Sequence, residues 1–316
     1  MLSSSAHTDL LTFMYQVYPA IDPTNPSNSA AGKVILVTGG GGGIGKAIAE
    51  AYNKAGAKAI AILGRRENLL RETAAELEKA GDAKIFFFAA DVLDEAALKT
   101  AFETVAKEAG PIDVVVANHG YLATPEPAAT ADVGDWWKAY GTLIHSPILV
   151  FRAEYALTCA RPEINIKGTL LTFRAWLPHK STNSPTFISL NTGAAHAGVF
   201  PGMSAYAPSK MASGHLASYF QAENPEIRVA SFHPGVIETD MAAKSGMPMS
   251  RDDMSLPSSF AVWLASPEAE WVGGRFFWAH WDVEELAQMK DEIVQNNELT
   301  FGVLGWPKQV EATIVA

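Results

Sequence analysis

The sequence predicts an α/β fold in a single domain, with a doubly wound parallel sheet and helices on both faces. Two observations carry this prediction. An apolar, mostly β-branched run at 34–37 is followed by five glycines and then by apolar residues at helical spacing. Short apolar runs and helix-like segments then alternate along the chain. Such alternation favours parallel strands joined by right-handed crossovers.

The first strand, turn and helix are typical of a site that binds a dinucleotide. Gly39 and Gly43 can take backbone angles closed to other residues, and Gly45 lets the helix pack closely on the strand. A cofactor pyrophosphate can then contact the free N–H groups and the positive end of the helix. The alternative is a flexible linker, but a buried strand and an amphipathic helix enclose the glycines.

The spacing of this turn, Thr38-Gly39-(three residues)-Gly43-Ile44-Gly45, is TGxxxGxG and not the GxGxxG of larger dehydrogenases. The pattern resembles the short-chain dehydrogenase/reductase family. The resemblance implies a Rossmann fold, a nicotinamide cofactor and hydride transfer to or from a small-molecule carbonyl or secondary alcohol. It also makes all five named residues of the turn cofactor-binding residues.

Composition excludes several other functions. The 316 residues are 48% hydrophobic and 18% charged, as in a globular chain with a core. A net charge of −10 argues against nucleic-acid or anionic-membrane binding. The single cysteine, Cys159, excludes an internal disulfide framework and a cysteine-rich metal site. The sequence has neither an apolar run long enough to span a membrane nor a signal-peptide pattern. We therefore expect a soluble, cytoplasmic protein that binds neither a membrane nor a metal ion.

The chain divides into an N-terminal arm at 1–32, a catalytic domain at 33–280 and a C-terminal helical tail at 281–316. We expect the arm to lack regular elements but to pack on the body, because three prolines interrupt it and aromatic residues precede them. We expect the tail, with a helix near 283–295 and Trp306, to cover the substrate entrance or a neighbouring subunit. Arm and tail resemble those of filamentous-fungal members of the family.

Hydrophobic periodicity places the remaining elements. The first helix is expected to end at Gly56, since glycine suits a helix C-terminus. Apolar runs predict strands at 58–63, 84–89, 112–117, 185–190, 226–232 and 275–278. Helical spacing predicts helices at 67–79, 96–109 and 259–265. The segment 240–259, rich in Met, Ser and Pro, is interpreted as a substrate lid.

The end of the second strand indicates which cofactor is used. An acidic residue there would accept hydrogen bonds from ribose hydroxyls, whereas an arginine pairs with a 2′-phosphate. Gly64 stands about where the acid would be, and Arg65 follows it. The sequence therefore favours NADP(H) over NAD(H). The alternative is that Arg65 and Arg66 only begin the next helix at the surface.

Polar residues also follow the third and fourth strands. The resemblance implies that Asp91 and Val92 contact the adenine, although Asp91 or Asp94 could equally cap the next helix. Asn118 matches the family's Asn-Asn-Ala-Gly pattern, which implies that it holds the central strands and the cofactor wall together. His119 invites an acid–base role, but this fold does not require a histidine there.

Tyr206 and Lys210 form YxxxK, a spacing that places both side chains on one face of a helix. A free tyrosine has a pKa near ~10 and is a poor base at neutral pH. We expect the neighbouring ammonium and an oxidised nicotinamide to favour the phenolate and lower the pKa of Tyr206. The resemblance makes Tyr206 the general acid and base, and Lys210 the residue that also holds the nicotinamide ribose.

Two further catalytic residues follow from the resemblance. Thr192, 14 residues before Tyr206, stands where the family has a serine. Its hydroxyl can still donate to the substrate oxygen, although its methyl group restricts the rotamer; Ser189 is the alternative. Asn165 matches the helix asparagine whose surroundings hold a water that passes protons towards the lysine. The missing serine leaves a second interpretation, a dinucleotide-binding or regulatory protein with little or no turnover.

The segment after the sixth strand resembles the family's PGxxxT. The resemblance implies that Pro234, Gly235, Ile237 and Thr239 bind the cofactor. The Ile237 backbone would orient the nicotinamide carboxamide, and Thr239 would reach a phosphate. His196, earlier in the chain, is interpreted as a surface or structural residue.

One segment, 141–162, interrupts a helix that would otherwise continue from 136 into 163–170. It contains the cysteine and two prolines. It is either a genuine substrate-side or interface loop or a translated, retained intron, since its 22 residues correspond to a whole number of codons. In the resembled family, the subunit interface lies at this helix. The resemblance therefore implies a homodimer or homotetramer if the insertion permits such assembly.

Overall fold

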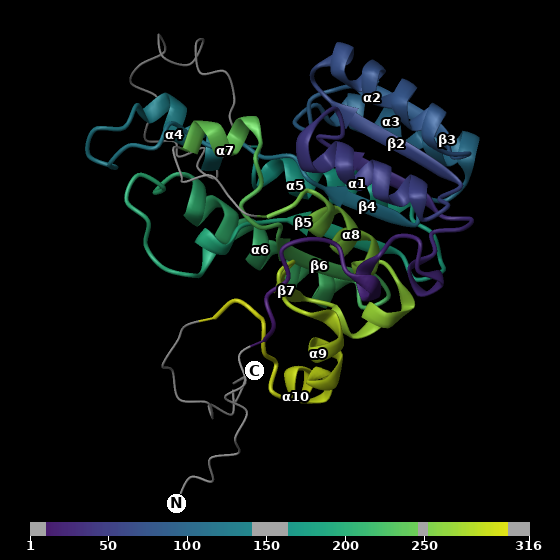
Figure 1. Cartoon of the computed structure of the whole chain (residues 1–316). Helices are drawn as coiled ribbons and strands as arrows, with labels where there is room; N and C mark the ends of the chain where they lie inside the picture. The colour runs from purple at the N-terminus through teal and green to yellow at the C-terminus, as the bar shows by residue number, and fades with distance from the viewer. Residues whose placement is uncertain (1–10, 141–163, 246–251, 303–316) are drawn as a thin grey trace, which may run out of the picture.

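The computed structural model describes residues 11–140, 164–245 and 252–302. Their strands form one parallel sheet of seven strands in the order β3-β2-β1-β4-β5-β6-β7 (Figure 1). The strands are β1 Val34–Thr38, β2 Ala59–Gly64, β3 Lys84–Ala89, β4 Val114–Ala117, β5 Thr186–Leu190, β6 Arg228–His233 and β7 Arg275–Trp278. The predicted doubly wound parallel sheet is therefore confirmed.

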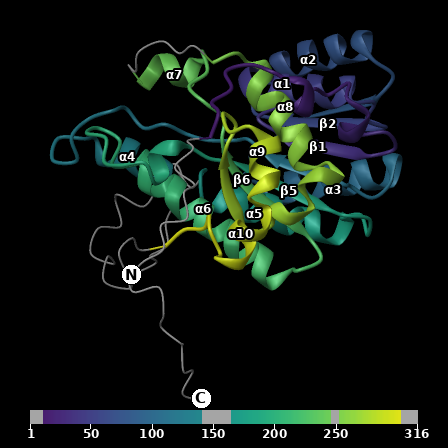
Figure 2. The same cartoon turned by 60° about the horizontal axis from the view of Figure 1, so that its bottom comes forward.

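Helices connect the strands and cover both faces of the sheet (Figures 1 and 2). Helices α1, α2 and α8 pack on one face, and α3, α5 and α6 on the other. The α-helices are α1 Gly43–Lys54, α2 Glu67–Ala80, α3 Glu95–Ala109, α4 Val133–Tyr140, α5 Lys167–Trp176, α6 Tyr206–Glu223, α7 Asp240–Ser245, α8 Ser255–Leu264, α9 Val283–Gln288 and α10 Lys290–Gln295.

Burial on both faces explains why the strands are continuous apolar runs. In β1, Ile35 and Val37 face one core cluster, whereas Val34 and Leu36 face the other. All four side chains are buried, and each such burial stabilises the fold by about 1.5–3 kcal/mol. The strand ends that carry the site are thus fixed by two cores.

The order of the strands determines where a ligand binds. From β1 the chain moves outward to β2 and β3, and it then returns to β4 on the other side of β1. The crevice at such a reversal, outside the carboxyl ends of the strands, is the usual ligand site of an open α/β sheet. Thr38 and Ala117 are register partners at the ends of β1 and β4, so Gly39 and Asn118 emerge side by side.

The predicted lid over 240–259 is wrong in its second half. Helix α8 begins at Ser255, and its Leu256 and Phe260 are fully buried in the core beside α1. Pro257 lies in the first turn of α8, where a missing N–H breaks no helical hydrogen bond. Residues 246–251 lie outside the described part of the chain, and α7 remains as the described part of the expected lid.

The N-terminal arm packs along the end of β7. Its two short 3-10 turns, η1 Pro19–Ile21 and η2 Pro26–Asn28, each begin at a proline. Phe13 forms a bridge with Trp281, and the buried Tyr18 hydroxyl accepts the N–H of Val283 at 2.8 Å. The expected packing of the arm on the body is therefore confirmed.

The described part of the tail also packs on the domain. Val283 and Leu286 of α9 and Ile293 of α10 are buried in the same core cluster as Phe260. None of them lines the pocket described below. The expectation that this part of the tail covers the substrate entrance is therefore wrong, and Trp306 lies outside the described residues.

The unusual segment 141–162 lies outside the described residues, so its interpretation stays a prediction. The helix expected to resume at 163–170 begins at Lys167 as α5. Among the described residues, no helix combines the length and apolar character needed to cross a membrane.

Candidate active site

A cavity of about 750 Å³ opens at the carboxyl ends of β1, β4, β5 and β6. All but three of the site residues predicted above line it: Gly39, Gly43, Ile44, Arg65, Asp91, Val92, Asn118, Thr192, Tyr206, Lys210, Pro234, Gly235, Ile237 and Thr239. Thr38, Gly45 and Asn165 lie behind its wall. Among the described residues, no cluster of three or more His, Cys, Asp or Glu side chains could hold a metal ion.

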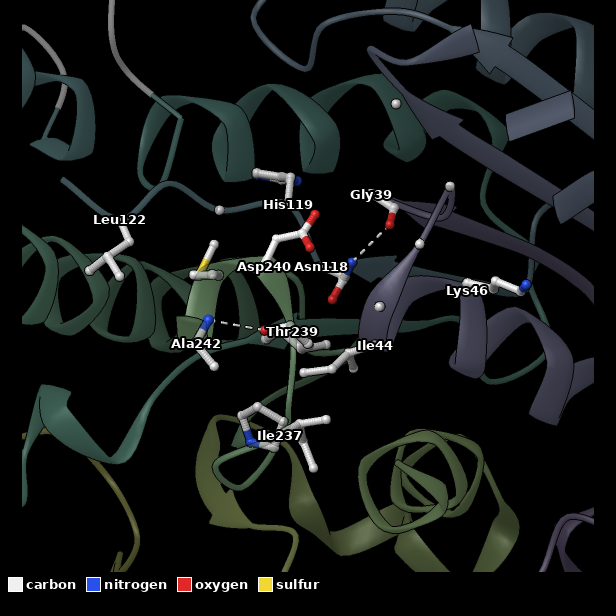
Figure 3. A pocket seen from close by; sticks show the side chains of 18 of the residues that line it. Gly39, Ile44, Lys46, Asn118, His119, Leu122, Ile237, Thr239, Asp240 and Ala242 are labelled. Atoms are coloured by element: carbon white, nitrogen blue, oxygen red, sulfur yellow. Dashed lines mark hydrogen bonds between the residues drawn. The ribbon is translucent and has the colours of Figure 1, made fainter. Parts of the chain in front are cut away.

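The glycine turn between β1 and α1 forms one wall of the cavity. Gly39 and Gly43 have φ angles of +67° and +53°, the left-handed conformation expected of them. Gly45 has no room for a side chain, because a Cβ there would collide with the Gly39 carbonyl and the Asn118 amide. Asn118 donates from Nδ2 to the carbonyls of Thr38 and Gly39 at 3.1 and 3.3 Å (Figure 3). Asn118 thus ties β4 to the turn, as expected.

His119 forms part of the same wall without an evident catalytic role. Its Nδ1 lies 2.8 Å from the Thr38 hydroxyl, and its Nε2 lies 3.4 Å from the Thr169 hydroxyl. Burial, assisted by the nearby Lys210 ammonium, lowers the pKa of His119 to about 3. The imidazole is therefore neutral at ordinary pH, and the two threonines hold it in place.

Tyr206 and Lys210 lie one turn apart at the start of α6. Burial raises the pKa of Tyr206 to about 12 and lowers the pKa of Lys210 to about 8. The expected lowering of the Tyr206 pKa is therefore not found in the unliganded protein, where burial outweighs the effect of the neighbouring Lys210 ammonium. The reason is that desolvation dominates both groups, while the Lys210 ammonium donates to the carbonyl of Leu190 at 2.8 Å.

Asn165 lies just before α5 and is buried behind Lys210. Its Nδ2 donates to the Ser209 hydroxyl at 2.9 Å and to the carbonyl of Tyr121 at 3.0 Å, and its Oδ1 accepts the Tyr121 N–H at 2.9 Å. A Cβ added at Gly120 would lie 3.5 Å from both Asn165 Oδ1 and Lys210 Nζ. These two polar atoms therefore border the same small space.

Thr192 follows β5 and faces the cavity from the side opposite the glycine turn. Its Oγ1 accepts the N–H of Ala194 at 3.3 Å, which leaves the hydroxyl hydrogen available to a ligand. The alternative, Ser189, is buried within β5 and does not line the cavity. Asn191 also lines the cavity, and its Nδ2 donates to the carbonyl of Lys210 at 2.9 Å.

The ends of β2 and β3 form the far end of the cavity. Arg65 and Arg66 are exposed there, and Arg66 Nη1 lies 3.7 Å from the Asp240 carboxylate of α7. Asp94 caps α3 by accepting the N–H groups of Ala96 and Ala97, each at 3.0 Å. The capping role therefore belongs to Asp94, which leaves Asp91 in the cavity wall.

Comparison with known proteins identifies the family. The short chain dehydrogenase profile matches residues 33–249. The chain belongs to the short-chain dehydrogenase/reductase family of oxidoreductases. It is 32% identical over 299 residues to short chain dehydrogenase/reductase AacuD of Aspergillus aculeatus, covering 93% of this chain and 95% of that protein. It is 31% identical over 294 residues to short chain dehydrogenase mpl6 of Monascus purpureus, covering 87% and 92%.

Solved members of the short-chain dehydrogenase/reductase family share the fold. A short chain dehydrogenase from Shigella flexneri, solved with NADP, has a TM-score of 0.66 and 22% identity, covering 80% of this chain and 99% of that one. A 7α-hydroxysteroid dehydrogenase, solved with NADH and 7-oxo glycochenodeoxycholic acid, has a TM-score of 0.68 and 23% identity, covering 81% and 95%.

Sequence reasoning missed two groups of residues around the cavity of this protein. Leu122, Met203 and Met241 line the cavity near Tyr206, but isolated apolar residues in loops carry no recognisable pattern. Asp252 and His280 form a buried pair behind the loop at 234–237, with 3.0 Å between carboxylate and imidazole. They come from distant parts of the chain, so no local signal could have revealed them.

Proposed function

We propose that this protein is an NADP(H)-preferring oxidoreductase that interconverts a small-molecule carbonyl and the corresponding secondary alcohol. One observation carries the proposal. Tyr206, Lys210 and Thr192 face a cavity that also contains the glycine turn at the reversal between β1 and β4. Proton-transfer groups and a dinucleotide cradle thus share one space. Assembly into a homodimer or homotetramer stays a prediction.

The residues of the cavity fit a dinucleotide. The glycine turn presents the N-terminus of α1, whose free N–H groups and positive end suit a pyrophosphate. Gly43 is exposed, and Gly42 has nothing within 4 Å of an added Cβ, so the backbone can be approached closely. Asp91 and Val92 would hold the adenine end, the loop at 234–237 the nicotinamide end, and Thr239 a phosphate. When bound, the cofactor supplies or accepts the hydride.

The side chains around Tyr206 supply the proton and hold the substrate oxygen. The high pKa of the buried phenol keeps Tyr206 protonated at neutral pH, which is the form that donates to a carbonyl oxygen during reduction. The Thr192 hydroxyl donates a second hydrogen bond to the same oxygen. For oxidation, Tyr206 must first lose its proton, and the positive charge of Lys210 stabilises the phenolate. Asn165 keeps the polar space beside Lys210 in place.

Substitution of Tyr206 tests the proton-transfer role. Tyr206→Phe should abolish NADPH-dependent carbonyl reduction, followed by the loss of NADPH absorbance, while NADPH binding by intrinsic fluorescence stays within about threefold. An active Tyr206→Phe variant would refute this mechanism. Tight NADPH binding without turnover of any carbonyl by the wild type would instead favour a dinucleotide-binding homologue, the alternative raised by Thr192 in place of serine.

The position of Arg65 beside Gly64 supports the preference for NADP(H). Arg65 is exposed at the far end of the cavity, and the wall there has no carboxylate at position 64 to accept ribose hydroxyls. Arg65→Ala should weaken NADPH binding about tenfold and leave NADH binding unchanged. Arg71→Ala is the matched control, because Arg71 lies nearby in the chain, on α2, but pairs with Glu67 and does not line the cavity. Equal affinities of the wild type for NADPH and NADH would overturn the preference.

A further inference from the structure

The loop that follows β6 is supported from behind by a buried carboxylate. The N–H of Val236 donates to Asp252 Oδ2 at 2.7 Å, and the same oxygen lies 3.0 Å from His280 Nε2. The Asp252 and His280 side chains are only 6% and 7% exposed. A charge-assisted hydrogen bond to a backbone N–H is among the stronger ones in a protein, particularly when it is sheltered from water.

The loop and the carboxylate fit closely together. Gly235 has a φ of +97°, and a Cβ added there would lie 2.7 Å from Asp252 Oδ2. A side chain at 235 would therefore push the carboxylate away from the Val236 N–H. The glycine of the PGxxxT-like segment allows both the turn and the approach of Asp252.

The N-terminal arm covers this pair from outside. The ring of Phe13 stacks on His280 with centroids 5.6 Å apart, and the ring of Tyr15 meets His280 edge-on at 5.8 Å. Two backbone hydrogen bonds hold the arm in place. The Met14 N–H donates to the His280 carbonyl at 2.7 Å, and the Asp253 N–H donates to the Tyr15 carbonyl at 2.8 Å. The arm thus keeps water from the two side chains behind the loop.

The supported loop lies at one end of the cavity only. Pro234, Gly235 and Ile237 line the cavity beside Tyr206 and Lys210, whereas Arg65 and Asp91 lie at the ends of β2 and β3. Asp252 and His280 do not themselves line the cavity. Any effect they have on a ligand must therefore pass through the loop and should be confined to the end of the ligand near Tyr206.

We propose that Asp252 and His280 are positioning residues that fix the loop at 234–237 for the nicotinamide half of the cofactor, with arm residues 13–15 as their cover. The inference rests on the proposed function for the identity of the ligand. The conformation of the loop is independent of the proposed function, because the Asp252–Val236 hydrogen bond holds the loop in the unliganded protein.

The test compares two ligands that differ at the nicotinamide end. For Asp252→Ala, the Kd for NADPH should rise about tenfold, whereas the Kd for 2′,5′-ADP, which lacks the nicotinamide half, should stay within twofold. His280→Gln should raise the NADPH Kd less, because the carboxylate still accepts the Val236 N–H. Asp253→Asn is the matched control, because this carboxylate accepts the Ser255 N–H at 2.8 Å, at the start of α8, and not the Val236 N–H of the loop. It should leave both Kd values unchanged.

Hydrogen exchange of the unliganded protein provides the second readout. In Asp252→Ala, the peptide that contains Val236 should exchange about tenfold faster than in the wild type, and in Asp253→Asn it should not. Equal weakening of NADPH and 2′,5′-ADP, or unchanged exchange at Val236, would overturn the inference. If the wild type binds neither ligand, the proposed function fails, and the hydrogen-exchange result alone tests whether Asp252 supports the loop. If Asp252→Ala does not fold, Asp252→Asn and His280→Gln give the same comparison.

Discussion

The buried Lys210 makes the stability of this protein depend on pH in a way that one substitution can isolate. Its side chain is buried in the cavity wall, where burial lowers the pKa of the ammonium to about 8 from its ordinary value of 10.5. Lys210→Met removes the titrating group and keeps a side chain of similar length. The difference in the free energy of unfolding between wild type and variant should then report this one titration.

The sign and size of the effect follow from linkage. Between pH 8 and 10.5 the unfolded chain holds a proton on Lys210 that the folded protein has released, so the free energy of unfolding rises with pH. One pKa unit corresponds to about 1.4 kcal/mol, so the wild type should gain about 2 kcal/mol relative to Lys210→Met between pH 7 and pH 10. Tyr206, whose pKa is raised, has the opposite effect above pH 10, because the folded protein then retains a proton that the unfolded chain loses.

Urea unfolding of both proteins at pH 7, 8, 9 and 10 measures this difference. We expect it to be constant below pH 7 and to grow steadily from pH 8 to pH 10. A difference that does not change with pH would refute the reasoning, because it would mean that burial does not disfavour the charged form of Lys210. A difference that shrinks with pH would mean that the folded protein stabilises the ammonium.

Substitutions at three further positions test separate parts of the site. Thr192→Ala should lower kcat for carbonyl reduction about 100-fold, and Thr192→Ser should stay within about threefold of wild type; equal losses would exclude the hydroxyl as the donor. Gly45→Ala should lower the free energy of unfolding in urea by about 1–3 kcal/mol and abolish NADPH binding, because its Cβ collides with Gly39 and Asn118. Normal NADPH binding would contradict this. Because the pKa of His119 is lowered to about 3, the free energy of unfolding of the wild type should fall by about 2 kcal/mol from pH 7 to pH 5. His119→Gln should not show this loss in urea unfolding; parallel curves would contradict it.

The parts of the fold that the sequence predicted correctly are those in which a local pattern reflects burial. The predicted strands at 84–89 and 275–278 match β3 and β7 to the residue, because each is a short apolar run that begins directly after a charged residue, Lys84 or Arg275. The strand ends then located the cavity, since parallel strands present their carboxyl ends at one edge. The glycine turn was predictable for the same reason, because its backbone conformation depends on the glycines themselves.

The features that could not be predicted depend on tertiary burial. The composition of 240–259 indicated a lid, but Leu256 and Phe260 belong to the core because α8 packs on α1. The YxxxK spacing placed Tyr206 near Lys210, yet the pKa of each depends on desolvation, which the spacing does not encode. Asp252 was invisible for a similar reason, since its partner on the loop, Val236, is 16 residues away in the chain.

The two ends of the cavity are therefore built in different ways. At the glycine turn, the geometry is set by backbone conformation and by one nearby amide, that of Asn118. At the proposed nicotinamide end, Asp252 bonds the loop and pairs with His280, and arm residues that precede the first strand cover this pair. The arm, which the sequence marks only as a proline-rich segment, thus contacts the support of the proposed catalytic end. We therefore expect changes in the arm to act on the loop at 234–237 and not on the glycine turn, whose conformation depends on its own backbone and on Asn118.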